Sequence, residues 1–177
     1  RDDASKSLER GDPEVSGVAY DSRSVKKGDV FVCVSGYKSD GHAFAEKAVL
    51  AGASAVVSEK PLNLNGTFNA VVPDARAALS RISSEFFGNP SRKLMTVGVT
   101  GTNGKTTTAF LTAAVFRSWG VRTGLLGTIY YDMDGEKRKS PNTTPESYEL
   151  QKLLAEMVEK KYGAAVMEVS SHSLELK

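Results

Sequence analysis

Met95-Thr-Val-Gly-Val-Thr-Gly-Thr-Asn-Gly-Lys-Thr-Thr-Thr108 is the stretch that decides the fold of this 177-residue chain. Residues 95–99 read as a buried strand, 101–104 as a glycine-bearing loop, and 106–119 as a helix. A strand, a loop and a helix in this order direct backbone N–H groups and the positive end of the helix dipole at an anion. The stretch therefore predicts a phosphate-binding loop.

The residue types of this loop suit a phosphate group. Gly101 and Gly104 let the backbone approach a ligand closely. Lys105 can reach the β- and γ-phosphates of a nucleotide, and the Thr106 hydroxyl can bind Mg²⁺. The general phosphate-loop pattern requires a glycine where this chain has Val99, so that pattern is not fully met. An ordinary glycine-rich turn before a helix is the alternative reading.

Strands and helices alternate on both sides of the loop, which predicts an α/β fold. Before the loop we expect strands at 16–20, 30–34, 53–58 and 68–72, and helices at 43–51 and 74–87, the second with Asp74 as its N-cap residue. After it we expect a strand at 124–131, a turn at Asp134-Gly135, a helix from Thr144 to about Tyr162 and a strand at 164–169. Proline and small polar residues at 89–92 suggest a linker. The expected domains are a small α/β domain at 1–90 and the start of a mononucleotide-binding α/β domain at 91–177.

Charge and composition argue against several classes of protein. The formal net charge of +2 does not fit the basic stripe of a nucleic-acid binder. The densest basic run, Lys137-Arg-Lys139, follows an expected turn and reads as a solvated hairpin arm. No apolar run approaches the roughly 18 residues that cross a bilayer. Cys33, the only cysteine, reads as a buried small hydrophobe, and a chain without disulfides fits a reducing cytoplasm.

A second acidic candidate lies near the end of the sequence. Glu168 ends a buried-looking strand, and ligands of open α/β sheets bind at the carboxyl ends of strands. A carboxylate that faces a bound nucleotide is a suitable Mg²⁺ ligand. Alternatively, Glu168 forms a structural salt bridge. His172 follows on the same segment, and its role stays open between a structural and a supporting one.

Several motifs together resemble the Mur ligase superfamily, which includes folylpolyglutamate synthases. Thr100-Gly-Thr-Asn-Gly-Lys-Thr106 is the form of the phosphate loop found in that superfamily, and the departure at Val99 favours it over general NTPases. Asn142-Thr-Thr-Pro145 and Glu168-Val-Ser-Ser-His172 resemble MurE-type rather than MurF-type ligases.

The N-terminal half carries its own resemblance. This half resembles the uridine-nucleotide domain shared by MurE and MurF ligases. The motifs that carry the resemblance are, in order, Asp21-Ser-Arg23, Gly28-Asp-Val-Phe31, Gly36, Asp40-Gly-His-Ala-Phe44 and Gly52-Ala53. The resemblance implies that residues 37–42 lie near the uridine of the substrate. We assign no individual contact to them. This domain argues against a folylpolyglutamate-type ligase.

The resemblance implies a role for each motif. ATP would bind through Gly101, Thr102, Asn103, Gly104, Lys105, Thr106 and Thr107. Mg²⁺ would be held by Thr106 and Glu168, with Lys105 and Glu168 as catalytic residues. UDP-MurNAc-L-Ala-D-Glu would contact Ser22, Asn142, Thr143, Thr144 and Ser170. On pattern alone, Thr144 could be only a helix N-cap, and Arg23 only a partner in a structural ion pair.

The implied activity is that of an ATP-dependent ligase of peptidoglycan precursor synthesis. ATP would phosphorylate the free carboxylate of the D-glutamyl residue, and the amine of diaminopimelate or lysine would attack the acyl phosphate. Family members are much longer than 177 residues, so we expect a fragment that is inactive alone. The alternative is a nucleotide- or UDP-sugar-binding module without turnover. The choice of diamino acid and the oligomeric state cannot be predicted.

Overall fold

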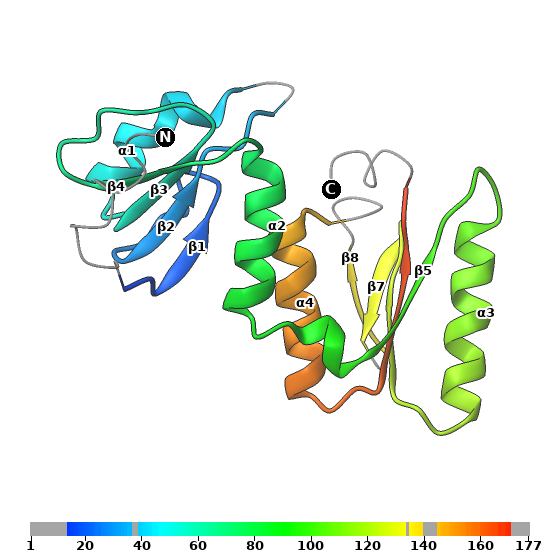
Figure 1. Ribbon diagram of the computed structural model, residues 1–177. Coiled ribbons are helices and arrows are strands. Elements are labelled where there is room, and N and C mark those ends of the chain that lie inside the picture. Colours follow the sequence, from blue (N-terminus) through cyan, green and yellow to red (C-terminus); the bar gives the residue numbers. More distant parts are fainter. Residues whose placement is uncertain (1–13, 37–38, 134, 140–144, 171–177) are drawn as a thin grey trace, which may run out of the picture. The chain divides into compact units, whose positions relative to one another are not determined.

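The computed structural model describes residues 14–36, 39–133, 135–139 and 145–170. The chain divides into two compact units, Arg1–Ile82 and Ser83–Lys177, and each contains one sheet (Figure 1). The division falls within a helix, a few residues before the expected linker at 89–92. In the part of the chain that is described, no helix is long and apolar enough to cross a membrane.

The first unit is built on a four-stranded parallel sheet in the order β1-β2-β3-β4 (Figure 1). Its strands are β1 (Gly17–Ala19), β2 (Asp29–Val32), β3 (Ala55–Ser58) and β4 (Phe68–Val71). Every residue of β2 and β3 is buried, as expected for inner strands of a parallel sheet. Its helices are η1 (Gly41–Phe44) and α1 (Ala45–Leu50), and α2 (Ala75–Phe86) begins in this unit.

Two local predictions for this unit are confirmed. The Asp74 carboxylate accepts a hydrogen bond from the Ala77 N–H at 2.8 Å, so it caps α2 as expected. Cys33 is completely buried beside Phe31 and Val56, and burial raises the pKa of its thiol to about 12. Such a thiol is a core residue rather than a nucleophile.

The second unit contains a five-stranded sheet in the order β5-β9-β6-β7-β8 (Figure 1). The strands are β5 (Met95–Val99), β6 (Thr123–Leu126), β7 (Tyr130–Met133), β8 (Glu136–Lys139) and β9 (Ala164–Glu168). Strands β5, β9 and β6 are parallel, whereas β7 and β8 extend the sheet as an antiparallel hairpin. The helices are η2 (Pro90–Lys93), α3 (Lys105–Ser118) and α4 (Ser147–Glu159).

The two long helices of this unit cover opposite faces of its sheet (Figure 1). Neighbouring residues of a strand point to opposite faces. Leu126 and Ala165 accordingly pack with Leu154 and Met157 of α4. Leu125 and Val166, one position along each strand, pack with α3. This arrangement confirms the α/β fold class.

Three expectations for this unit were wrong. The strand expected at 124–131 is two strands, because residues 127–129 turn the chain and the Gly127 N–H donates to the Tyr130 carbonyl at 3.2 Å. The helix expected from Thr144 begins at Ser147, with Glu146 as its N-cap residue. Strand β5 is not buried, because it lies at the edge of the described sheet. Within the expected linker at 89–92, residues 90–92 belong to η2 and Asn89 is its N-cap residue, and the linker itself stays a prediction.

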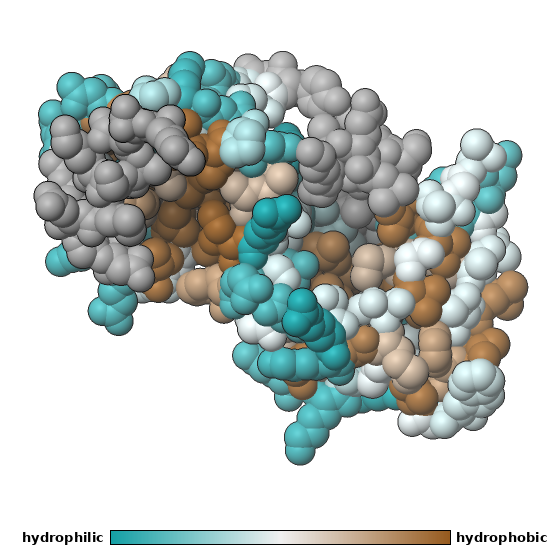
Figure 2. All heavy atoms as spheres, viewed as in Figure 1, coloured by the Kyte–Doolittle hydropathy of each residue, from teal (hydrophilic) through white to brown (hydrophobic). Residues whose placement is uncertain are grey.

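Apolar side chains remain exposed on the outer side of α3. Leu111 and Val115 on this helix and Trp119, its C-cap residue, are spaced four residues apart and are 63%, 48% and 74% exposed. Met95, on the edge strand β5, is 49% exposed. Figure 2 shows brown, apolar atoms reaching the surface on this side of the second unit.

Candidate functional site

The loop between β5 and α3 has the backbone shape that its glycines predict. Gly101 has a φ of +141° and Gly104 a φ of +76°, which other residues rarely adopt. A Cβ added to Gly104 would meet no described heavy atom within 4 Å, so the conformation, and not crowding, requires glycine there. Residues 100–104 are exposed and leave the loop open to a ligand.

The start of α3 supplies the positive character of the loop. Lys105 is the first helical residue, and its ammonium group donates to the Gly101 carbonyl at 2.8 Å. The N-cap residue Gly104 has no side chain to accept hydrogen bonds from the first-turn N–H groups. Uncapped N–H groups and a lysine at a helix N-terminus together favour a bound anion.

The structure brings Thr106 and Glu168 together. Glu168 is the last residue of β9, it is paired in register with Val99 of β5, and it is 1% exposed. The Thr106 hydroxyl donates to Glu168 Oε2 at 2.8 Å, although the two residues lie 62 positions apart in the sequence. The carboxyl ends of adjacent parallel strands thus place the predicted metal ligands side by side.

Thr128 is a further contact of Glu168, and the sequence analysis missed it. Its N–H donates to Oε1 at 3.0 Å, and its hydroxyl donates to Oε2 at 3.0 Å. Gly127 lies against the same carboxylate, because a Cβ there would be 2.8 Å from Oε1. No sequence signal pointed to this contact, because Gly127 and Thr128 lay inside the single strand expected at 124–131, whereas they follow the end of β6.

The oxygen atoms at this site fit a small divalent cation better than a softer metal. Mg²⁺ takes oxygen ligands and commonly uses one or two protein groups, with water and phosphate oxygens completing its shell. Thr106 and Glu168 offer one hydroxyl and one carboxylate within hydrogen-bond distance of each other. No group of three His, Cys, Asp or Glu side chains is arranged as a metal site in the described residues. The donor set therefore fits a divalent cation such as Mg²⁺.

The predicted substrate residues of the first unit form a separate group. Ser22 is partly buried in a turn that the Ser24 N–H closes on the Asp21 carbonyl at 2.9 Å. Arg23 forms an ion pair with Asp21, with 2.6 Å between Nη2 and Oδ2. These hydrogen bonds lower the pKa of Asp21 to about 2 and raise that of Arg23. The sequence left the role of Arg23 open, and the structure shows it as the partner of Asp21 in an ion pair.

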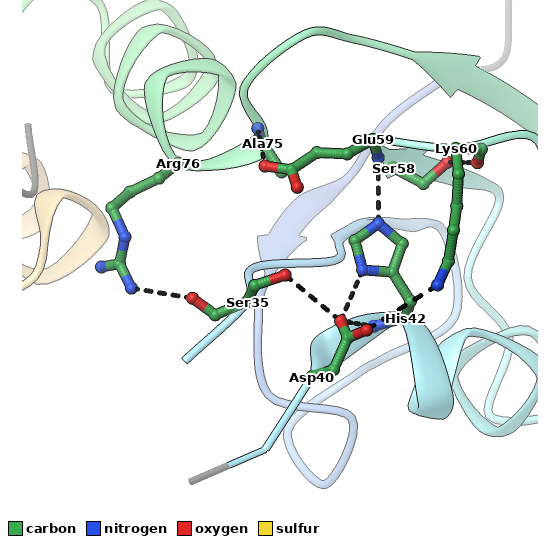
Figure 3. A network of polar contacts seen from close by, with 8 residues as sticks. All are labelled: Ser35, Asp40, His42, Ser58, Glu59, Lys60, Ala75 and Arg76. Carbon is green, nitrogen blue, oxygen red and sulfur yellow. Dashed lines mark hydrogen bonds and ion pairs between the residues drawn. The ribbon is translucent and has the colours of Figure 1, made fainter. Parts of the chain in front are cut away.

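A second polar network lies in the first unit and includes Asp40 and His42 (Figure 3). The His42 ring is 5% exposed and lies between Asp40, 2.5 Å from its Nδ1, and the Glu59 N–H, which donates to Nε2 at 2.9 Å. These partners place the ring proton on Nδ1. Glu59 in turn accepts from the Ala75 N–H at 2.9 Å, which connects the network to the start of α2. Residues 37 and 38 lie outside the described part of the chain.

The remaining predicted residues are only partly described. Ser170 follows β9 and is partly buried. Asn142, Thr143, Thr144 and His172 lie outside the described residues, so their assigned roles stay predictions.

Comparison with known proteins identifies the family. Residues 14–93 match the model described as "Mur ligase family, catalytic domain", and residues 99–177 match "Mur ligase middle domain". The chain belongs to the Mur ligase family. Both matches lie where the sequence motifs placed a Mur ligase resemblance, so that resemblance is confirmed.

Relatives of the chain carry a specific name, UDP-N-acetylmuramoyl-L-alanyl-D-glutamate–2,6-diaminopimelate ligase. The protein of Clostridium botulinum is 48% identical over 167 residues, covering 92% of this chain and 35% of the relative. That of Syntrophomonas wolfei is 46% identical over 166 residues, covering 93% and 34%. The chain thus spans about a third of the length of these curated relatives.

Solved structures agree with the fold. A structure of a ligase with the same name superposes with a TM-score of 0.76 at 32% identity, covering 92% of this chain and 33% of the other. A Thermotoga maritima MurF ligase solved with ADP superposes with a TM-score of 0.59 at 24% identity, covering 93% and 36%. The second likeness, at this identity, supports the fold alone.

Proposed function

We propose that this chain forms the UDP-sugar-binding and ATP-binding part of a MurE-type ligase. That enzyme joins a diamino acid to UDP-MurNAc-L-Ala-D-Glu through an acyl phosphate, in peptidoglycan precursor synthesis in the cytoplasm. The relatives named above are diaminopimelate ligases, which favours diaminopimelate over lysine. The observation that carries the proposal is the contact of Thr106 and Glu168 beside an uncapped helix N-terminus.

The phosphate loop has a defined role in this proposal. Residues 101–107 would hold the phosphates of ATP against backbone N–H groups of the loop and of α3. Lys105 donates to Gly101 at 2.8 Å, and this ammonium group could turn to the β- and γ-phosphates without moving the helix. A fixed positive charge at that place stabilises the charge that spreads over the transferring phosphoryl group.

Thr106 and Glu168 would hold Mg²⁺ in this proposal. The metal, when bound, supplies charge neutralisation and orientation of the phosphates. The Thr106 hydroxyl, which donates to Glu168 at 2.8 Å, would offer an oxygen lone pair to the metal, and Glu168 would offer its carboxylate. Glu168 is 1% exposed, so its carboxylate lies away from water, where its attraction to a cation would be stronger than at the surface.

Substrate binding would fall to two groups of residues. Ser22 in the first unit would contact the UDP-sugar part of UDP-MurNAc-L-Ala-D-Glu. The other proposed contacts are Asn142, Thr143, Thr144 and Ser170. Hydroxyl and amide groups suit such a ligand because they bind both phosphate and carboxylate oxygens.

Nucleotide binding by this chain tests the proposal. Titration calorimetry with ADP and Mg²⁺ should detect binding to the wild-type chain, and Lys105→Ala should weaken it at least about tenfold, because a charge-assisted contact is lost. Lys93→Ala is the matched control, since Lys93 is an exposed lysine of η2 and is expected to leave affinity unchanged. Equal affinity of Lys105→Ala and wild type, with unchanged circular dichroism, would overturn the assignment of the loop.

A binding module without turnover is the competing function. The two functions separate in a phosphate-release and product assay with ATP, UDP-MurNAc-L-Ala-D-Glu and diaminopimelate. Under the ligase proposal the full-length protein makes product, and Lys105→Ala lowers its kcat by about 10²-fold or more. Nucleotide binding without product from the full-length protein would favour the binding module.

A further inference from the structure

Thr128 makes two hydrogen bonds to a buried carboxylate from an exposed position. The Thr128 N–H reaches Oε1 of Glu168 and its hydroxyl reaches Oε2, each at 3.0 Å. Glu168 is 1% exposed, whereas Thr128 is exposed. We propose that Thr128 is a positioning residue, which orients the Glu168 carboxylate toward a divalent cation bound with the nucleotide. This inference rests on the proposed function.

The bonds from Thr128 fix the orientation of the carboxylate plane. A carboxylate held through one oxygen can still rotate, whereas donors to both oxygens from one residue restrict that rotation. Thr106 donates to Oε2 as well, at 2.8 Å. Whether or not the Thr106 hydroxyl keeps its bond to Oε2 when its oxygen binds a metal, the two bonds from Thr128 hold the carboxylate. Partners of this kind that orient a ligand typically change metal affinity by about 10–100-fold when they are removed.

The turn that carries Thr128 does not depend on its hydroxyl. The Gly127 N–H and the Tyr130 carbonyl close the turn between β6 and β7 at 3.2 Å. The absence of a side chain at Gly127 is what lets the turn come this close, since a Cβ would be 2.8 Å from Glu168 Oε1. A purely structural role would therefore leave metal affinity unchanged when only the hydroxyl is removed.

The test measures Mn²⁺ binding by electron paramagnetic resonance on the chain saturated with ADP. Mn²⁺ accepts the same oxygen ligands as Mg²⁺ and is visible in this experiment. Thr128→Val keeps the N–H donor and the size of the side chain but loses the hydroxyl donor. It should bind Mn²⁺ about tenfold more weakly, with ADP affinity measured in EDTA and circular dichroism unchanged. Thr128→Ser restores the hydroxyl and should return Mn²⁺ affinity to within about twofold of wild type.

Two further variants sharpen the comparison. Gly127→Ala should also weaken Mn²⁺ binding, because its Cβ would press on Glu168 Oε1. Thr123→Val is the matched control: Thr123 is a buried threonine of β6 whose hydroxyl donates to the Val121 carbonyl at 2.8 Å, away from Glu168. It should leave Mn²⁺ affinity unchanged. If Thr128→Val failed to fold, the pair Thr128→Ala and Thr128→Ser would give the same comparison with smaller side chains.

The outcomes separate this inference from the proposed function. A wild-type chain that does not bind ADP would contradict the proposed function, and this inference with it. Normal ADP binding with equal Mn²⁺ affinity in wild type and Thr128→Val would overturn the positioning role alone. Equal losses of Mn²⁺ affinity in Thr128→Val and Thr123→Val would also overturn it, because the effect would then be one of general destabilisation.

Discussion

The buried ring of His42 offers a perturbation whose size follows from its contacts. His42→Phe keeps an aromatic ring in the site but removes both polar contacts of the imidazole (Figure 3). The Glu59 N–H, which donates to Nε2 at 2.9 Å, would then face carbon. Asp40, 2.5 Å from Nδ1, would lose a donor but can turn to water, because its side chain is 50% exposed. The larger loss therefore comes from the Glu59 N–H.

The expected loss of stability is about 2 kcal/mol. An N–H group that is left covered and unpaired costs about 1–3 kcal/mol, and the exposed contact of Asp40 adds little. Because about 1.4 kcal/mol corresponds to a factor of ten, the open form of the first unit should become about 30-fold more populated. The second unit has its own sheet, so its stability should be unchanged.

Cys33 provides the assay, because it is the only cysteine and is completely buried in the core of the first unit. Its rate of labelling by a thiol reagent reports how often that unit opens. Labelling of His42→Phe should be about 30-fold faster than that of wild type. Hydrogen exchange followed by mass spectrometry should show the matching loss of protection in peptides of β2 and β3, and none in β9.

Lys60→Gln is the control, because Lys60 contacts the same Asp40 at 3.8 Å but is 60% exposed. Removing such a surface pair should change the free energy of unfolding by less than about 1 kcal/mol. The reasoning is refuted if His42→Phe labels Cys33 within threefold of the wild-type rate. It is also refuted if protection of β9 falls as much as that of β2.

Two further predictions concern stability. The pKa of Glu156 is lowered from 4.5 to about 2 by hydrogen bonds from Arg138 and then Lys160, so this carboxylate stabilises the fold above pH 4.5, and that contribution is lost as the pH falls toward 2. Acid titration followed by circular dichroism should show a smaller loss of stability in Glu156→Gln than in wild type over that range, and parallel curves would contradict the assignment. Asp74→Ala should destabilise the fold by about 1 kcal/mol in urea denaturation, because the Ala77 N–H loses its cap, whereas Asp74→Ser should retain most of that stability.

Local features of the fold could be predicted because local chemistry sets them. Residues 95–99 form a strand with the expected bounds, and the glycines that follow adopt positive φ angles. Asp74 caps its helix, since an N-cap interaction spans only three residues. The turn at 127–129 was not predicted, because the apolar residues on both sides are typical of strand and glycine is compatible with strand or turn.

Burial of a strand depends on its neighbours, which a sequence pattern does not supply. The residues of β5 are as apolar as those of β9, yet β9 lies between two strands and β5 lies at the edge of the described sheet. The same pattern therefore corresponds to a largely exposed strand in one case and to a buried one in the other. Length, composition and periodicity could not distinguish the edge strand from the inner strand, because periodicity indicates the faces of a strand and not its place in a sheet.

The candidate site follows from the order of three strands rather than from any one motif. Strands β5, β9 and β6 are parallel neighbours, so the segments after them emerge at the same edge of the sheet. After β5 comes the glycine-bearing loop that precedes α3, β9 ends on Glu168, and β6 is followed by Gly127 and Thr128. The first two carry recognisable motifs, whereas Gly127-Thr128 becomes informative only once β6 is known to lie beside β9. Thr128 therefore contacts Glu168 although the two residues lie 40 positions apart in the sequence, because β6 and β9 are neighbours in the sheet.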